Sequence, residues 1–219
     1  MSKAVINLKN IEHNISYLNS VINKSQMFAV IKANAYGHGS VKIAKLLSNH
    51  NIFGFCVATE DEVLELVQNK ISKPILHLGK IDPSNSNIFK FDNVRCTLND
   101  LTDIAILESY SKKLSKKIKC HIKVDTGMNR MGLKFHDFEE NINLIMKNQH
   151  LDVEAVYSHL ACSSESESKQ NIEQIEKFKL CIDLMSGHNE VKYHLLSTSG
   201  IFNFNDNIYD FARLGLSIY

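Results

Sequence analysis

Short runs of apolar residues alternate with longer amphipathic segments along the whole chain. The short runs predict eight β-strands, over residues 27–31, 53–57, 75–78, 94–97, 118–124, 153–157, 193–196 and 211–213. Helical spacing of apolar positions predicts helices over residues 41–47, 60–67, 84–89, 101–114, 138–146 and 172–185. Strands that alternate with helices predict a parallel sheet covered on both faces. Eight such units form either a closed (β/α)8 barrel of the TIM type or an open, doubly wound sheet, and periodicity alone does not choose between them.

The two ends of the chain depart from this repeat. Residues 4–8 predict a short strand ahead of a helix over residues 11–22, before the first unit. Residues 214–219 stop where another helix is expected, so we expect a shortened chain. With no linker-like segment, residues 1–219 are interpreted as one α/β domain with a displaced N-terminal strand. At 219 residues it is somewhat shorter than the typical barrel of about 250.

Composition excludes several classes of protein. Hydrophobic residues make up 44% of the chain and charged residues 22%, as in ordinary globular domains. The net charge of +1 argues against a nucleic-acid or membrane-surface protein, because both need a basic face. No apolar run reaches the roughly 18–20 residues of a membrane span. The five cysteines include no C-x-x-C pair, which predicts free thiols in a reducing cytoplasm and no metal site.

Chemically capable side chains follow several of the predicted strands. They are Lys32, Tyr36, Arg130, His159, Ser197, Thr198 and Arg213. The carboxyl ends of parallel strands lie on one side of the sheet, so these side chains are expected to gather there. A lysine amine, a hydroxyl-rich helix start and polar groups for a ring suit a phosphorylated aldehyde cofactor.

Each residue also has a plain structural explanation. Lys32 is equally well a surface lysine leaving its strand, and Arg130 an exposed arginine in a turn. A lone histidine such as His159 is more often structural than functional. The hydroxyls at 197–199 are more commonly a simple helix N-cap than a phosphate site.

Four segments resemble one family. Residues 29–39, Ala-Val-Ile-Lys-Ala-Asn-Ala-Tyr-Gly-His-Gly, closely resemble the pyridoxal-phosphate attachment motif of bacterial alanine racemases, and residues 125–132, 158–161 and 213–219 follow in that family's order. The resemblance implies the pyridoxal 5'-phosphate-binding barrel of an enzyme that interconverts L-alanine and D-alanine for peptidoglycan precursors. It also implies a homodimer, in which a β-rich C-terminal domain supplies a tyrosine to the partner's active site as a second base. Because the chain ends before that domain, we expect it to bind the cofactor weakly or not at all and to racemise poorly.

The resemblance assigns a role to each matching residue. Lys32 would carry the cofactor and act as one base, Tyr36 would reach its phosphate, and His159 would lie against its ring. Arg213 would donate to the ring nitrogen, and Arg130 to the phenolic oxygen and the substrate carboxylate. The phosphate cup would comprise Ser197, Thr198, Gly215 and Leu216, although the family commonly has Asn-Ser at 197–198. Lys123 matches a lysine that many members carry in carbamylated form.

Two alternatives stay open at this point. The first is a non-catalytic, single-domain homeostasis protein of the same barrel superfamily, which binds pyridoxal phosphate. Such proteins are near this length, but they do not share the sequence motifs of residues 32–39 and 125–132. A barrel without any cofactor, serving as an interaction scaffold, is the second alternative.

Overall fold

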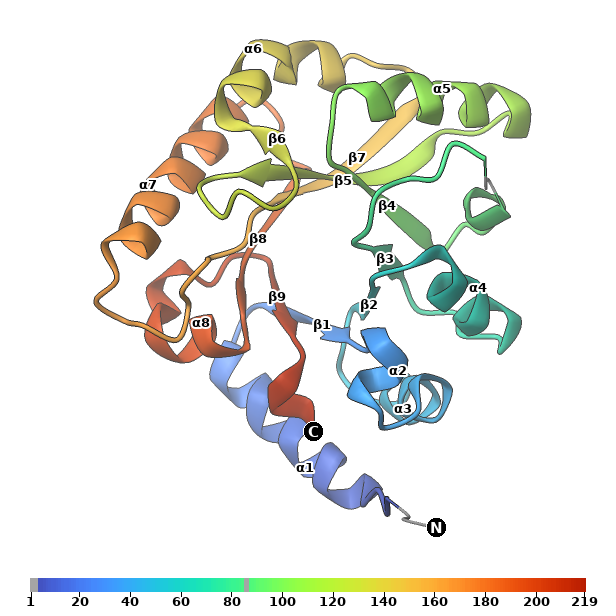
Figure 1. The fold of residues 1–219 in the computed structure, drawn as a ribbon, viewed down its shortest axis with the longest axis vertical. Helices are drawn as coiled ribbons and strands as arrows, with labels where there is room; N and C mark the ends of the chain where they lie inside the picture. Colours follow the sequence, from blue (N-terminus) through green and yellow to red (C-terminus); the bar gives the residue numbers. More distant parts are fainter. Residues whose placement is uncertain (1–3, 85–86) are drawn as a thin grey trace.

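Eight parallel strands close into a barrel in the computed structural model, which describes residues 4–84 and 87–219 (Figure 1). They are β1 Gln26–Val30, β2 Gly54–Val57, β3 Ile75–His77, β4 Val94–Leu98, β5 Ile118–Asp125, β7 Leu151–Tyr157, β8 Lys192–Ser197 and β9 Phe211–Leu214. The sheet runs β4-β3-β2-β1-β9-β8-β7-β5, and a further pairing of β4 with β5 closes the ring. The prediction of a TIM-type barrel is therefore confirmed. The two-residue strand β6, Leu133–Lys134, pairs with β5 beside the ring.

Helices surround this barrel. They are α1 Leu8–Ile22, α2 Lys32–Tyr36, α3 Ser40–Leu47, α4 Glu60–Gln68, α5 Thr102–Leu114, α6 Phe135–Met146, α7 Lys169–Leu184 and α8 Thr198–Asn203, with 3-10 turns η1 Asn87–Lys90, η2 Asn205–Asn207 and η3 Leu216–Ile218. Most predicted helices begin or end within three residues of these bounds. Of the predicted helix over 84–89, residues 85–86 lie outside the described residues, and η1 overlaps the remainder. No helix in the described ranges is long and apolar enough to cross a membrane.

Alternate side chains of each strand point either to the barrel axis or to the layer between the strands and the helices. In β1, Met27 and Ala29 face the layer between strands and helices, whereas Phe28 and Val30 face the barrel axis. The same alternation in β9 places Phe211 on the axis and Ala212 outside it. The apolar cluster inside the barrel is small, comprising Phe28, Val30, Cys56, Leu76 and Phe211. Polar side chains therefore share the space along the axis.

The predicted strand over residues 4–8 is wrong. Residues 4–7 have no regular structure, and Leu8 already belongs to α1. A strand needs a neighbour for its backbone hydrogen bonds, and none of the described strands pairs with this segment. Asn7 instead caps α1, with its side chain accepting a hydrogen bond from the Lys9 amide at 3.1 Å. Val5 is 91% exposed.

Helix α1 covers the outer side of the barrel where the last strand ends (Figure 1). It packs on β1 and on η3, the short turn that follows β9. The Asn14 amide donates to the Ile218 carbonyl at 3.2 Å, which joins the first helix to the last turn. A predicted helix that did not fit the repeat thus completes the outer layer.

Candidate functional site

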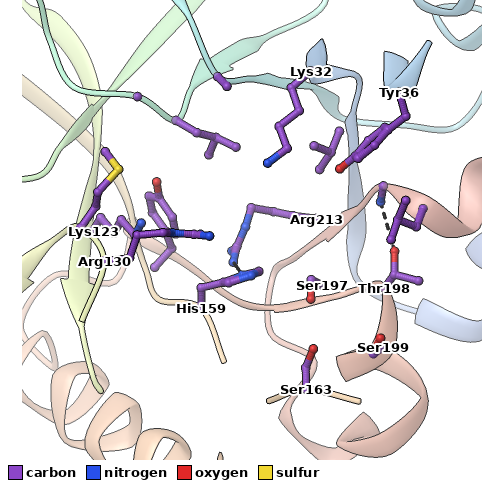
Figure 2. Close-up of a pocket in the computed structure, with 18 residues that line it drawn as sticks. Lys32, Tyr36, Lys123, Arg130, His159, Ser163, Ser197, Thr198, Ser199 and Arg213 are labelled. Carbon is purple, nitrogen blue, oxygen red and sulfur yellow. Dashed lines mark hydrogen bonds between the residues drawn. The ribbon is translucent and has the colours of Figure 1, made fainter. Parts of the chain in front are cut away.

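A cavity of about 450 Å³ lies at the carboxyl ends of the strands. All ten predicted site residues line it: Lys32, Tyr36, Lys123, Arg130, His159, Ser197, Thr198, Arg213, Gly215 and Leu216. Lys32 and Tyr36 extend into the cavity from one side, and Arg213 lies between Lys32 and His159 (Figure 2). Residues from β1 to β9 therefore meet in one place, as the strand-end argument predicts.

A left-handed turn presents Lys32 and Tyr36 to this cavity. After Lys32, the residues Ala33, Asn34, Ala35 and Tyr36 all have φ between 51° and 54°. Left-handed geometry costs about 1–2 kcal/mol for each residue with a side chain, so the turn stores roughly 4–8 kcal/mol of strain. Strain of this size persists only where surrounding contacts impose it, and it is typical of functional sites.

Hydroxyl and backbone donors gather below Tyr36. A Cβ atom built on Gly215 would lie only 2.8 Å from the Tyr36 hydroxyl, so the tyrosine rests directly on this glycine. The Gly215 amide donates to Thr198 Oγ1 at 3.2 Å, and Thr198 Oγ1 lies 3.2 Å from Ser217 Oγ. Thr198 is also the first residue of α8. Backbone amides and hydroxyls in this arrangement can hold an anion.

Arg213 is held by a nearly complete set of hydrogen bonds. One terminal nitrogen donates to His194 Nδ1 at 2.7 Å and to the His194 carbonyl at 3.1 Å. The other donates to the carbonyls of Ser158 and Leu195, at 2.6 and 3.0 Å, and contacts His159 Nδ1 at 3.2 Å. Its Nε–H has no acceptor among the described residues. One fixed donor is thus left over for a ligand.

A row of polar side chains continues from Arg213 along the barrel axis. His194 Nε2 lies 3.0 Å from His121 Nδ1, and His121 Nε2 lies 3.8 Å from Glu154 Oε2. Arg95 donates two hydrogen bonds to the same carboxylate, at 2.7 and 3.2 Å. Burial would raise the pKa of Glu154, but the bonds from His121 and Arg95 hold that pKa down to about 2. The row therefore ends on an ionised carboxylate.

The guanidinium sets the tautomers along this row. A guanidinium only donates, so His194 Nδ1 must accept and His194 Nε2 must carry the hydrogen. His121 Nδ1 then accepts, and its Nε2–H points at Glu154. Burial lowers the pKa of both histidines, so they are neutral donors and acceptors in series. Burial, with help from Arg213, also lowers the pKa of His159 to about 3.

The family model for the alanine racemase N-terminal domain matches residues 6–219. The chain belongs to this family. It is 33% identical to the alanine racemase of Carboxydothermus hydrogenoformans over 218 residues, which is 99% of this chain and 59% of that protein. The alanine racemase of Clostridium difficile superposes with a TM-score of 0.93 at 27% identity, covering all of this chain and 59% of that one.

A third relative bears on the cofactor. The structure of the Bartonella henselae alanine racemase with covalently bound pyridoxal phosphate has a TM-score of 0.86 at 26% identity, over 98% of this chain and 62% of that one. This chain therefore spans about three fifths of the length of the alanine racemases it matches.

Within this alanine racemase N-terminal domain, sequence reasoning missed Tyr157. Its ring stacks on His194 at a centroid distance of 4.6 Å, and the Arg213 guanidinium lies 4.8 Å from the ring centroid. Its hydroxyl is 3.0 Å from Thr97 Oγ1. Tyr157 thus helps to fix both His194 and Arg213. The sequence could have indicated Tyr157 because it directly precedes the segment 158–161 that resembles the family.

Two polar groups close in sequence to the site residues do not line the cavity. The Asp125 carboxylate accepts from the amides of Gly127 and Asn129, each at 3.0 Å, and so shapes the loop that carries Arg130. The Cys162 thiol, three residues after His159, donates to the Gln170 side chain at 3.5 Å. Residues 4–84 and 87–219 contain no group of three or more His, Cys, Asp or Glu side chains arranged for a metal ion.

Proposed function

We propose that this chain is the cofactor-binding domain of an alanine racemase, which carries pyridoxal 5'-phosphate on Lys32 and interconverts L-alanine and D-alanine for peptidoglycan synthesis. The full enzyme would be a cytoplasmic homodimer. One observation carries the proposal: a lysine amine, an anion-binding cluster and an arginine with one free donor share a single cavity. The bound cofactor reported for the Bartonella henselae relative supports it.

The residues present fit this cofactor. Lys32 offers the amine for covalent attachment, and Tyr36, Ser197, Thr198 and the backbone of Gly215 and Leu216 offer a cup for the phosphate. His159 would lie against the flat ring, and Arg130 would donate to the phenolic oxygen and to the substrate carboxylate. When bound, the cofactor supplies stabilisation of the negative charge that develops at the substrate α-carbon.

Arg213 would set how strongly that charge is drawn into the ring. Its unused Nε–H is a donor only, so it would face a ring nitrogen that keeps its lone pair. The neutral histidines behind it give the guanidinium no proton to pass on, because burial holds their pKa values low. Arg213 would therefore hold the ring nitrogen unprotonated.

Lys32 would remove or return the proton on one side of the substrate α-carbon. Racemisation also needs a base on the opposite side. Of the tyrosines that line the cavity, Tyr36 is assigned to the phosphate, and the hydroxyl of Tyr157 is buried against Thr97, with a raised pKa. We assign the second base to a tyrosine of the partner subunit in the complete enzyme. This chain alone should then be a poor racemase.

Lys123 would steady Arg130. Burial, together with the charges of Arg130 and Arg213, lowers the pKa of Lys123 to about 8. A substantial fraction of the amine is then neutral near pH 8, which reaction with carbon dioxide requires. The resulting carbamate would be negatively charged and would attract the Arg130 guanidinium.

Attachment is tested by incubating the chain with pyridoxal phosphate, reducing with borohydride and mapping the label by mass spectrometry. We expect the label at Lys32, its loss in Lys32→Ala, and no change in Lys45→Ala, which alters an exposed lysine of α3. A label at other lysines with none at Lys32 would refute the assignment.

Catalysis is tested separately in D2O with the cofactor-loaded chain and each alanine enantiomer. A chain with one base should exchange the α-hydrogen of one enantiomer for deuterium faster than it inverts that enantiomer. Labelling at Lys32 without any exchange would favour the alternative, a non-catalytic cofactor carrier. Inversion as fast as exchange would show that the one-base argument is wrong.

A further inference from the structure

Helix α4 contributes a carboxylate that bridges two loops of the cavity. Glu62 Oε1 accepts from the Ala33 amide at 2.6 Å, at the first residue of the left-handed turn. Glu62 Oε2 accepts from the amides of Ala58 and Thr59, at 2.7 and 3.2 Å, in the loop after β2. Both oxygens are therefore used, each for a different strand end.

The bond to Ala33 acts where the strain begins. Ala33 follows Lys32 directly and is the first residue of the turn with a positive φ. Its amide hydrogen bonds to Glu62 rather than to a backbone carbonyl, so the turn has an external tether at this end. The next residue of the turn is tethered as well, because the Ser40 amide donates to Asn34 Oδ1 at 2.9 Å and Ser40 Oγ donates to Glu65 Oε2.

We propose that Glu62 is a positioning residue, whose carboxylate holds the left-handed turn so that Lys32 and Tyr36 reach the cavity together. The inference rests on the proposed function of those two residues. It concerns a side chain that does not line the cavity and acts only through the backbone at Ala33.

The bridge needs a carboxylate. A glutamine at this position has one acceptor oxygen and one amide that only donates. Its oxygen should stay with the two N–H groups of Ala58 and Thr59, which leaves its amide facing the N–H of Ala33, and two donors cannot bond each other. Glu62→Gln therefore loses one half of the bridge while keeping the size of the side chain.

Glu62 also completes the capping box of α4 with Thr59, and this simpler role has to be separated from positioning. Thr59→Ala is the matched control, because it removes the Thr59 Oγ1 bond to the Glu62 amide and leaves the Ala33 bond in place. Asp61→Asn is the charge control, since it neutralises an exposed carboxylate in the same first turn.

The first measurement is amide hydrogen exchange in the cofactor-free chain, followed at Ala33 and the next four residues by NMR. Ala33 is exposed, so protection of its amide must come from its hydrogen bond to Glu62. We expect at least tenfold faster exchange in Glu62→Gln, equivalent to about 1.4 kcal/mol, and wild-type protection in Thr59→Ala and Asp61→Asn. Glu62→Asp, which is too short to span both loops, provides a second variant should Glu62→Gln fail to fold.

The second measurement is the rate of reducible adduct formation at Lys32. We expect about a tenfold lower rate in Glu62→Gln, with Thr59→Ala and Asp61→Asn unchanged. If the wild-type chain forms no adduct at Lys32, the proposed function fails, whatever Ala33 exchange shows. If the wild type forms it and Glu62→Gln matches Asp61→Asn in both exchange and adduct formation, the positioning role is refuted.

Discussion

Gly215 leaves space that a single methyl group would fill. Its φ of −126° lies outside the left-handed region, and the missing side chain leaves room for the Tyr36 hydroxyl. The added Cβ of Gly215→Ala would lie 2.8 Å from the Tyr36 hydroxyl and 3.4 Å from two of its ring carbons. Since ordinary contact begins near 3.4 Å, the hydroxyl must move by about 0.6 Å. Because Tyr36 is only partly buried, its ring can move, so the cost to folding should stay below about 1 kcal/mol.

Gly215→Ala should instead weaken the binding of the cofactor. A hydrogen bond from the tyrosine to a charged phosphate is worth about 1.5–3 kcal/mol, so its loss should weaken binding roughly 10- to 150-fold. The assay is a titration with pyridoxal phosphate, followed by the absorbance of the adduct at Lys32 and checked by borohydride mapping. Gly187→Ala is the control, because no atom lies within 4 Å of its added Cβ.

A double-mutant cycle with Tyr36→Phe decides whether the methyl group acts through the hydroxyl. Once the hydroxyl is absent, Gly215→Ala should cost little further affinity. Wild-type affinity in Gly215→Ala, or fully additive losses in the double variant, would refute the reasoning.

Three further predictions concern the buried charges. Arg213→Met leaves the carbonyls of Ser158 and Leu195 without these donors. The free energy of unfolding, measured in urea, should therefore fall by about 3 kcal/mol or more, and a loss under about 1 kcal/mol would contradict the prediction. Glu154 has a folded pKa of about 2, below its ordinary 4.5, so between these two pH values the unfolded chain binds more protons and the folded state loses stability as the pH drops. Glu154→Gln should remove on the order of 2 kcal/mol of this pH dependence. Identical pH profiles of stability for the variant and the wild type would refute the prediction. Lys123 should react with an acylating reagent at half its maximal rate near pH 8, and a midpoint above pH 10 would show that its surroundings do not lower its pKa.

The sequence pattern alone determined the strands, the helices and the parallel sheet, whereas the closure of that sheet into a barrel was visible only in the structure. Eight short apolar runs, most of them followed by amphipathic segments, predict the strands and helices that the barrel contains, because burial of a parallel sheet on both faces demands that pattern. Lys32, Arg130 and Arg213 follow or end their strands, and a parallel barrel brings such positions to one side. Local order along the chain was therefore sufficient to predict which residues share the cavity.

Local order was not sufficient for the segment before α1. Residues 4–8 are mostly apolar, like the short runs that form the strands, but a strand forms only where another strand accepts its hydrogen bonds. None of the described residues offers that edge, and Asn7 caps the helix instead.

Tertiary structure alone decided how the side chains of the site are held. The two-residue period of β5, β7, β8 and β9 turns His121, Tyr157, His194 and Arg213 toward the axis, where donors and acceptors from distant parts of the chain complete one another. The left-handed turn after Lys32 has no signal in residue propensity, since Ala, Asn and Tyr ordinarily avoid it in series. Glu62, 29 residues farther along the chain, supplies the acceptor for the amide of its first residue, Ala33. Sequence thus determined which residues meet, and long-range hydrogen bonding decided the geometry in which they meet.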